Sequence, residues 1–203
     1  MPNLVIIRHG QSVWNLENRF TGETDIELTA TGIAEAKKAG ELIKNFSFQT
    51  AYTSVLKRAI ETLKIILEIL NGTVVPVICN KALNERNYGD LQGLNKADTI
   101  EKYGEAQVLL WRRSFNEKPS NGESLKDTYN RVVPYYKNEI EPQLRNDNNI
   151  LIVAHGNSLR ALMMYLEGSS ETEIESIEIA TGVPRVYQFD RSLLLKKVYN
   201  LVS

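Results

Sequence analysis

Short apolar runs alternate along this chain with longer segments in which apolar residues recur every three or four positions. A short apolar run bounded by polar residues is typical of a buried strand. Such runs predict strands at residues 4–7, 50–53, 74–78, 150–154 and, at the end of the pattern, 186–189. The longer periodic segments predict helices at residues 28–46, 55–70, 96–115, 124–145 and 157–166.

Polar residues at the ends of these segments predict where several helices begin. Thr29 and Ser54 are expected N-caps, because a hydroxyl there accepts a hydrogen bond from the first turn. Ser124 and Asp127 have the spacing of a capping pair.

Glycine and proline predict where the helices break or end. Asn71-Gly72 is expected to end the second helix, and Gly104 to interrupt the third. Pro134 and Pro142 predict kinks or breaks within the fourth, because proline removes a backbone donor.

The alternation of strands and helices predicts an α/β fold with a mainly parallel central sheet flanked by helices. In such sheets ligands bind beyond the carboxyl ends of the strands. Residues 83–123 interrupt the alternation, and we expect them to form a small cap of helices and loops over that edge. The length of 203 residues favours a single domain spanning residues 1–203.

Composition and charge narrow the classes of function. The net charge of −1 gives no overall attraction to nucleic acid or to an anionic membrane. The apolar run after Met1 is too short for a signal-peptide core or a membrane span, so we expect a cytoplasmic protein. Cys79 is the single cysteine, which excludes an intrachain disulfide and a cysteine metal cluster.

The chain has two histidines, and both occur in the same local pattern. His9 and His155 each follow a predicted strand and precede a glycine, an amide residue and a serine. The pattern predicts two imidazoles at one edge of the sheet, with glycines that let a ligand approach the backbone. Helices that begin just after them would direct backbone N–H groups at an anion.

A neutral imidazole carries a lone pair at neutral pH and attacks phosphorus without a separate base. The pair of histidines therefore predicts phosphoryl transfer through a phosphohistidine at His9. Two alternatives stay open at this point. Both histidines could be core or capping residues, or they could bind zinc with a carboxylate as a further ligand.

Several cations and one carboxylate are candidates for the same site. Arg8 and Arg58 could clamp a phosphate, although Arg58 alone would suit a solvated helix face. Arg112 and Arg113 are neighbours on a predicted helix and would equally suit its surface, and Lys96 is ambiguous in the same way. Glu85 alone is typical of an ordinary loop carboxylate. Buried beside bound phosphate, however, it could act as a general acid and base.

Together these segments resemble the histidine phosphatase superfamily and, within it, the cofactor-dependent phosphoglycerate mutases. The resemblance covers essentially the whole chain. The Arg8-His9-Gly10 motif is common to the superfamily, whereas the runs at 85–96 and 111–113 are more specific to the mutases. The segments that carry it are residues 8–15, 18–22, 54–59, 83–96, 103–104, 107–114, 122–125, 154–162 and 166–168.

The resemblance implies a role for each matching residue. His9 would be the phosphorylated nucleophile, and Glu85 the proton donor and acceptor. Arg8, Arg58, His155 and Asn15 would form the phosphate pocket. The substrate's carboxylate and its other phosphate would be held by Thr21, Gly22, Tyr88, Lys96, Arg112, Arg113 and Asn157, with a backbone N–H from Gly156.

The activity that the resemblance implies is the interconversion of 3-phosphoglycerate and 2-phosphoglycerate in glycolysis and gluconeogenesis. It implies 2,3-bisphosphoglycerate as the primer, no metal, phosphoglycerates as the small-molecule partners, and neither nucleic acid nor membrane. Whether the protein is a monomer or a homo-oligomer stays open. Two rival functions are a phosphatase with the same His9 chemistry and a catalytically inactive protein that binds phosphorylated ligands.

The chain also departs from the family pattern. Glu23 follows Gly22, where members often have tryptophan. Only eight residues, 114–121, separate Arg113 from Gly122, where many members carry a longer insertion. The chain also stops soon after Tyr199, without an extended tail.

Overall fold

The computed structural model describes residues 1–70 and 74–202, and within them a six-stranded sheet has the order β3-β2-β4-β1-β5-β6. The strands are β1 (Asn3–Arg8), β2 (Thr50–Thr53), β3 (Val77–Cys79), β4 (Ile150–Ala154), β5 (Arg185–Phe189) and β6 (Leu195–Asn200). β3, β2, β4 and β1 are parallel, whereas β5 and β6 are antiparallel additions at one edge. The predicted α/β fold with a mainly parallel sheet is therefore confirmed.

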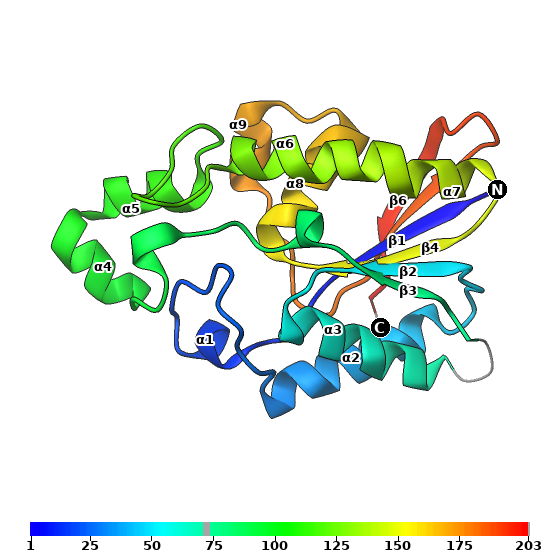
Figure 1. Ribbon diagram of the computed structural model, residues 1–203, viewed down its shortest axis with the longest axis horizontal. Helices are drawn as coiled ribbons and strands as arrows, with labels where there is room; N and C mark the ends of the chain where they lie inside the picture. Colours follow the sequence, from blue (N-terminus) through cyan, green and yellow to red (C-terminus); the bar gives the residue numbers. More distant parts are fainter. Residues whose placement is uncertain (71–73, 203) are drawn as a thin grey trace.

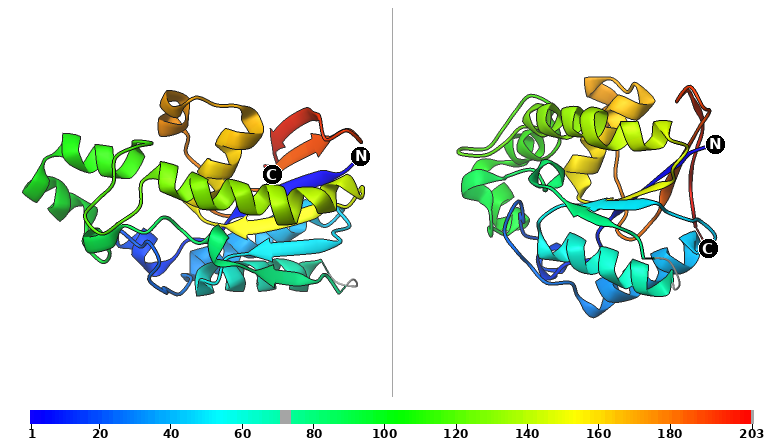
Figure 2. Two further views of the ribbon diagram at one scale, coloured as in Figure 1. Left: turned by 45° about the horizontal axis from the view of Figure 1, so that its top comes forward. Right: turned by 45° about the vertical axis from the view of Figure 1, so that its right-hand side comes forward.

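Helices cover both faces of the sheet (Figure 1). One face carries α2 (Ala30–Ile43) and α3 (Lys57–Ile69). The other carries α6 (Leu125–Tyr135), α7 (Glu141–Arg145), α8 (Gly156–Glu167) and α9 (Glu171–Ser176). The short α1 (Val13–Leu16), together with α4 (Lys96–Tyr103) and α5 (Glu105–Arg113), lies at the end of the molecule towards which the parallel strands run (Figures 1 and 2).

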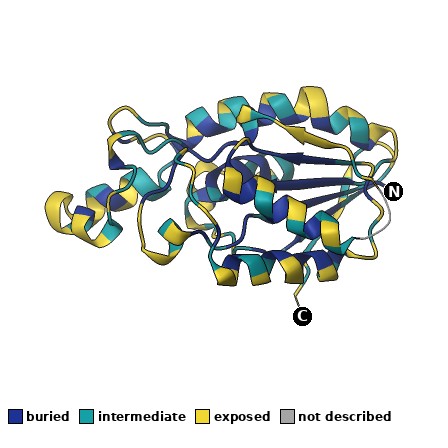
Figure 3. Cartoon of the chain, turned by 60° about the horizontal axis from the view of Figure 1, so that its bottom comes forward, coloured by how far each residue is buried: buried dark blue, intermediate teal, exposed yellow. Residues whose placement is uncertain are grey.

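The two-residue period of the strands divides the core into two halves. In β1, Leu4 and Ile6 pack with α6 and α8, whereas Val5 and Ile7 pack with α2 and α3. All four side chains are at most 1% exposed. β1, β2 and β4 form the buried centre of the molecule, and the helices packed on the sheet expose their outer faces (Figure 3). A strand buried on both faces reads as a continuous apolar run, as seen in this sequence.

The predicted caps are partly confirmed. Thr29 caps α2 by accepting a hydrogen bond from Gly32 N–H, and Ser124 and Asp127 form a capping box at α6. Ser54 is not the N-cap of α3, which begins after Leu56 without a side-chain cap. The N-cap prediction for Ser54 was wrong, because the Ser54 hydroxyl bonds to His155, the residue that follows β4.

The predicted helix breaks occur at Gly104 and between Pro134 and Pro142. Gly104 separates α4 from α5 with a φ of 82°, a left-handed conformation that favours glycine. Between Pro134 in α6 and Pro142 in α7 lies a π-helical segment, Tyr136–Ile140. The end of α3 predicted at Asn71-Gly72 lies outside the described residues.

Three elements, β3, α9 and β6, differ from the prediction. The strand expected at 74–78 is the shorter and later β3, an exposed edge strand. α9 and β6 were not predicted, because β6 mixes lysines with apolar residues and α9 is short and acidic. Residues 83–123 contain α4, α5 and the 3-10 turn Gly89–Leu91, and a second 3-10 turn, Lys81–Leu83, ends at their first residue.

Candidate active site

Three polar residues follow directly on the ends of neighbouring parallel strands. His9 follows β1, Ser54 follows β2 and His155 follows β4. Because β1 and β4 pair in register up to Arg8 and Ala154, the two imidazoles are brought together. Their ring centroids are 5.0 Å apart. The prediction that both histidines meet at one edge of the sheet is therefore confirmed.

The hydrogen bonds of His9 leave one ring nitrogen as an acceptor. Nδ1 lies 2.7 Å from the carbonyl oxygen of Gly10, to which it donates, and Nε2 accepts from Nε of Arg58 at 3.2 Å. Burial, followed by the charges of Arg58 and Arg8, holds the pKa of His9 well below its ordinary value. The imidazole is therefore neutral at pH 7, and its lone pair is on Nε2.

His155 lies beside His9 and is completely buried. Its Nε2 shares a hydrogen bond of 2.7 Å with the hydroxyl of Ser54, which also accepts from the backbone N–H of Leu56. Burial and the charge of Arg58 hold the pKa of His155 well below its ordinary value. Ser54 thus joins the start of the β2–α3 connection to the second histidine.

Two arginines flank His9. Arg58 is 1% exposed and donates to the carbonyl oxygens of Thr24 at 2.9 Å and Gly22 at 2.8 Å. Burial lowers its pKa to about 10, which leaves the guanidinium charged at neutral pH. Arg8 donates to the carbonyl of Ile179 at 2.7 Å, and within the described residues its buried Nε has no partner. The Nε–H of Arg8 is thus available to an anion.

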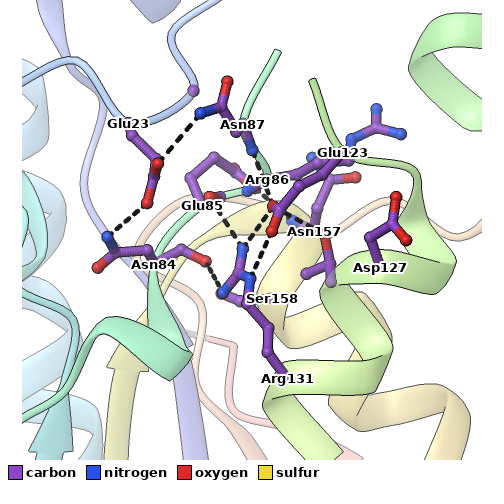
Figure 4. Close-up of polar contacts among 12 residues, drawn as sticks. Glu23, Asn84, Glu85, Arg86, Asn87, Glu123, Asp127, Arg131, Asn157 and Ser158 are labelled. Atoms are coloured by element: carbon purple, nitrogen blue, oxygen red, sulfur yellow. Dashed lines mark hydrogen bonds and ion pairs between the residues drawn. The ribbon is translucent and has the colours of Figure 1, made fainter. Parts of the chain in front are cut away.

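Glu85 is 8% exposed, and one oxygen of its carboxylate accepts two backbone hydrogen bonds. Oε1 accepts from Arg86 N–H at 2.8 Å and from Asn157 N–H at 3.1 Å (Figure 4). The N-terminus of α8 was expected to offer its N–H groups to an anionic ligand, yet the N–H of Asn157 is bonded to Glu85. Oε2 lies within 3.6 Å of the Cβ position that a side chain at Gly156 would take.

All of the predicted site residues except His155 line one cavity of about 530 Å³. They come from the strand ends, from the loop at 15–22 and from residues 85–113. The cavity residues predicted from sequence are Arg8, His9, Asn15, Thr21, Gly22, Arg58, Glu85, Tyr88, Lys96, Arg112, Arg113, Gly156 and Asn157. Arg58 is not on a solvated helix face, and Arg112 and Arg113 both reach the cavity.

The two glycines after the histidines differ in their surroundings. A Cβ on Gly10 would lie 2.2 Å from the carbonyl oxygen of Gly32, so Gly10 permits close packing on α2 rather than ligand approach. The expectation for Gly10 was therefore wrong. At Gly156 the nearest atoms are side-chain atoms of Glu85 and Arg8 at 3.6 and 3.7 Å, which is consistent with a backbone that faces the cavity.

A hydrogen-bonded network orders the part of the cavity wall that Tyr88 and Asn157 form. The hydroxyl oxygen of Tyr88 accepts from Arg86 at 2.9 Å and from Asn157 Nδ2 at 3.3 Å. Asn157 Oδ1 accepts from Arg160 at 3.1 Å. Burial is the largest single influence and opposes ionisation of Tyr88, but the charge of Arg86 and the hydrogen bonds from Arg86 and Asn157 together lower the pKa of the phenol. Since the Tyr88 oxygen already accepts two bonds, its own O–H is the group that can donate to a ligand.

Further interactions affect the charges of Lys96 and Arg113, which also line the cavity. Burial lowers the pKa of Lys96, and the phenol of Tyr88 opposes that shift. Arg113 forms an ion pair with Glu178, whose side chain is 76% exposed. Part of the positive charge at the cavity mouth is thus balanced by the protein.

Several residues of the cavity wall were not predicted from the sequence. Arg160, which is 4% exposed, was detectable because it lies three positions after Asn157 on the same helix. Arg19 and Phe20 lie within a segment that carried the family resemblance, yet received no role. Residues 177–181 also line the cavity, but no motif marks them in the sequence.

Two further structural findings concern metals and membranes in residues 1–70 and 74–202. In these ranges no group of three or more His, Cys, Asp or Glu residues is arranged to hold a metal ion. None of the helices there is long and apolar enough to cross a membrane.

The sequence model of the histidine phosphatase superfamily (branch 1) matches residues 4–200. This chain belongs to the histidine phosphatase superfamily. The site at His9, with Gly10 after it and Arg8 and Arg58 beside it, is thus the site of a member of this superfamily.

Curated relatives within the superfamily align with nearly the whole chain. A 2,3-bisphosphoglycerate-dependent phosphoglycerate mutase of Cytophaga hutchinsonii is 59% identical over 198 residues, covering 98% of this chain and 92% of the relative. A protein of the same name from Bacteroides fragilis is 46% identical, covering 99% of this chain and 92% of the relative.

Solved structures of the superfamily share the fold at lower identity. A mycobacterial glucosyl-3-phosphoglycerate phosphatase, solved with VO3, is 28% identical with a TM-score of 0.79 and 93% of each chain covered. The alpha-ribazole phosphatase from Shigella flexneri is 26% identical with a TM-score of 0.79, covering 97% of this chain and 95% of that one.

Proposed function

We propose that this chain is a 2,3-bisphosphoglycerate-dependent phosphoglycerate mutase that interconverts 3-phosphoglycerate and 2-phosphoglycerate. The observation that carries the proposal is one cavity that combines a neutral histidine with cations from several elements. Arg8 and Arg58 stand beside His9, whereas Lys96, Arg112 and Arg113 line the same cavity from α4 and α5 and would serve the other end of the substrate. The names of relatives at 46–59% identity support the same substrate.

The charge distribution suits the ligands of a mutase. A phosphoglycerate carries a phosphate and a carboxylate, and 2,3-bisphosphoglycerate carries two phosphates and a carboxylate. Charge-assisted hydrogen bonds to such groups are each worth about 1.5–3 kcal/mol. The free Nε–H of Arg8 and the O–H of Tyr88 are donors without a fixed acceptor among their described neighbours, so both suit an anionic ligand.

The chemical step begins on an enzyme phosphorylated at Nε2 of His9. The substrate hydroxyl attacks phosphorus, the N–P bond breaks and Nε2 regains its lone pair. The hydroxyl proton passes to Glu85. The resulting bisphosphoglycerate reorients, Nε2 of His9 attacks the other phosphorus, and Glu85 returns its proton to the leaving oxygen. Phosphoryl transfer depends mainly on positioning and charge neutralisation, which the arginines, with His155 beside His9, would supply here without a metal.

The remaining residues support binding in this proposal. Asn15 Oδ1 accepts from the backbone N–H of Ser12 at 3.1 Å, so its amide N–H groups are the part that can donate to phosphate. Thr21, Gly22, Gly156 and Asn157 would contact the substrate from the cavity wall. The reaction would belong to glycolysis and gluconeogenesis in the cytoplasm, with 2,3-bisphosphoglycerate as the primer that phosphorylates His9.

Hydrolysis is the competing function, since solved structures with the same fold are named phosphatases. Water would then take the phosphoryl group from His9. A simple phosphatase, however, gains little from the cations of the cavity beyond those beside His9, because they slow release of its product.

Paired assays of 2-phosphoglycerate formation and phosphate release, with and without primer, test the proposal. We expect mutase turnover to exceed phosphate release and to depend on primer in fully dephosphorylated enzyme. Faster phosphate release, or no effect of primer, would replace the mutase with a phosphatase.

A further inference from the structure

Glu23 forms a bridge to both sides of Glu85. Its Oε1 accepts from Nδ2 of Asn84 at 2.7 Å, and its Oε2 accepts from Nδ2 of Asn87 at 3.2 Å. The two asparagines flank the Glu85-Arg86 pair in the sequence, and Figure 4 shows the carboxylate of Glu23 between them. Glu23 itself does not line the cavity.

Backbone hydrogen bonds determine how the two amides are oriented. Oδ1 of Asn84 accepts from Val55 N–H at 3.2 Å, and Oδ1 of Asn87 accepts from Gly89 N–H at 2.7 Å. Both amides must therefore present their N–H₂ groups to residue 23. A carboxylate offers a separate oxygen to each amide, whereas a glutamine in the same place offers an oxygen to one and an N–H₂ group to the other.

The other end of this bridge is the loop that holds Arg58. Gly22 and Thr24, the two neighbours of Glu23, accept the two hydrogen bonds from the Arg58 guanidinium through their carbonyls. The backbone N–H of Glu23 donates to Oε1 of Gln92 at 2.9 Å. Glu23 thus connects the loop around the phosphate-binding arginine to the segment that carries Glu85.

A second brace holds the same segment from the opposite side. Arg131 donates to the carbonyl oxygens of Ala82, Asn84 and Glu85 at 2.9 to 3.1 Å. Arg131 also forms an ion pair with Glu123, which is drawn beside the segment in Figure 4. The hydrogen bonds of Arg131 go to this segment and to Glu123 and do not reach the loop around Arg58. Glu23, together with the bond from Val55 N–H to Asn84, therefore connects the Glu85 segment to the surroundings of Arg58.

We propose that Glu23 is a positioning residue that sets the Glu85 carboxylate against the phosphoryl group held by His9 and Arg58. The proposal rests on the proposed function, because it assigns a proton transfer to Glu85. Displacing the Glu85 carboxylate would lower kcat without weakening substrate binding, since the cations that would bind the substrate are other residues of the cavity.

The hydrogen-bond pattern gives a cycle of variants. In Glu23→Gln, the N–H₂ group of the glutamine faces the N–H₂ group of Asn87, so two donors oppose each other. In Asn87→Asp, two carboxylates face each other, although the introduced carboxylate can still accept from Gly89. In the double variant Glu23→Gln/Asn87→Asp, the glutamine N–H₂ faces the introduced carboxylate, and the glutamine oxygen still accepts from Asn84, so the bridge is restored.

The experiment measures steady-state mutase kinetics, vanadate inhibition and the melting temperature for the four proteins of the cycle. We expect each single variant to lose about tenfold in kcat, the size of effect that a small misplacement of a catalytic group produces. KM and the inhibition constant for vanadate should change by less than about twofold, and the double variant should recover most of kcat. Glu41→Gln, which removes another exposed hydrogen-bonded carboxylate, is the matched control and should be unchanged.

Three outcomes would overturn the proposal. These are unchanged kcat in both single variants, losses that add in the double variant, and losses of kcat that follow the melting temperature or KM. Failure of the proposed function is visible separately. If the unaltered enzyme releases phosphate rather than forming 2-phosphoglycerate, the same cycle is measured on phosphate release.

Discussion

His9 is a buried histidine between two guanidinium groups, and this position decides its protonation. Both neighbours repel a proton, and burial disfavours the imidazolium, so the pKa is held well below its ordinary value. The hydrogen bond from Nδ1 to Gly10 directs the lone pair to Nε2. We therefore predict one acid-labile phosphate on His9 after incubation with 2,3-bisphosphoglycerate.

Intact-mass analysis and peptide mapping under alkaline conditions check this prediction. His9→Ala should remain folded and lose turnover. A phosphate that maps to another residue would show that the nucleophile has been misassigned.

Glu85 has a carboxylate positioned by two backbone N–H groups at the cavity wall. Glu85→Gln keeps the shape and the accepting oxygen but cannot take up a proton. We expect turnover to fall by roughly 10²–10⁴-fold, as is usual for the loss of a general acid–base group. Inhibition by vanadate, measured in parallel, should be retained. Turnover equal to that of the unaltered enzyme would remove Glu85 from the mechanism.

At the scale of elements, α5 is held at its carboxyl end by one buried arginine. Arg86 is fully buried and donates to the carbonyl oxygens of Trp111 and Arg112, each at 2.9 Å. A guanidinium at this position stabilises the end of the helix dipole. It also fixes the part of α5 that presents Arg112 and Arg113 to the cavity.

We predict that Arg86→Met raises KM for 3-phosphoglycerate about tenfold or more, because charge-assisted hydrogen bonds worth roughly 1.5–3 kcal/mol no longer order the substrate-binding arginines. Initial-rate kinetics measure the change. Lys102→Met, on the exposed surface of α4, is the control. An unchanged KM in a folded Arg86→Met variant would mean that α5 is held by its other contacts, among them Val108 packed on Phe20 and Leu91.

At the scale of the whole molecule, two buried neutral histidines make stability depend on pH. Both have pKa values well below the ordinary 6.5, whereas in the unfolded chain they titrate near that value. Below pH 6.5 the unfolded state therefore binds more protons than the native state. Stability then falls as pH falls, by about 1.4 kcal/mol per pH unit for each histidine.

Urea denaturation at pH 7.5, 6.5 and 5.5 tests this dependence. We expect His9→Gln to show a smaller loss of unfolding free energy between pH 6.5 and 5.5 than the unaltered protein, because one of the two histidines is removed. Carboxylates contribute equally to both proteins and cancel in the comparison. Equal losses would mean that His9 is protonated in the native state.

The proposed mechanism also predicts that the whole enzyme works without a bound metal. The arginines provide the charge neutralisation that magnesium provides in kinases. Prolonged chelation should leave mutase turnover unchanged, with metal content measured by mass spectrometry. Loss of activity that zinc, manganese or magnesium restores would contradict the mechanism.

Much of the site was predictable because its geometry follows from local patterns. Parallel strands end at one edge of a sheet, so residues that follow β1 and β4 had to meet there. The spacing of the helical segments likewise placed Arg58 about one turn from the end of β2 and Asn157 less than one turn from the end of β4. Glu85, Tyr88 and the Trp111-Arg112-Arg113 run were predicted through their resemblance to a family, not through any local pattern.

From the sequence came most of the helices and strands, the parallel centre of the sheet and the edge at which the two histidines lie, because these depend on periodicity and on neighbouring residues; α9, β6 and the bounds of β3 did not follow from it. The tertiary structure alone decided that Ser54 bonds to His155 instead of capping α3, that Gly10 packs on α2, and that Glu23 bridges two asparagines 61 and 64 residues away. The physical reason is that each polar group bonds to whichever partner the packing brings within reach. That partner comes from a distant segment, about which the local sequence carries no information.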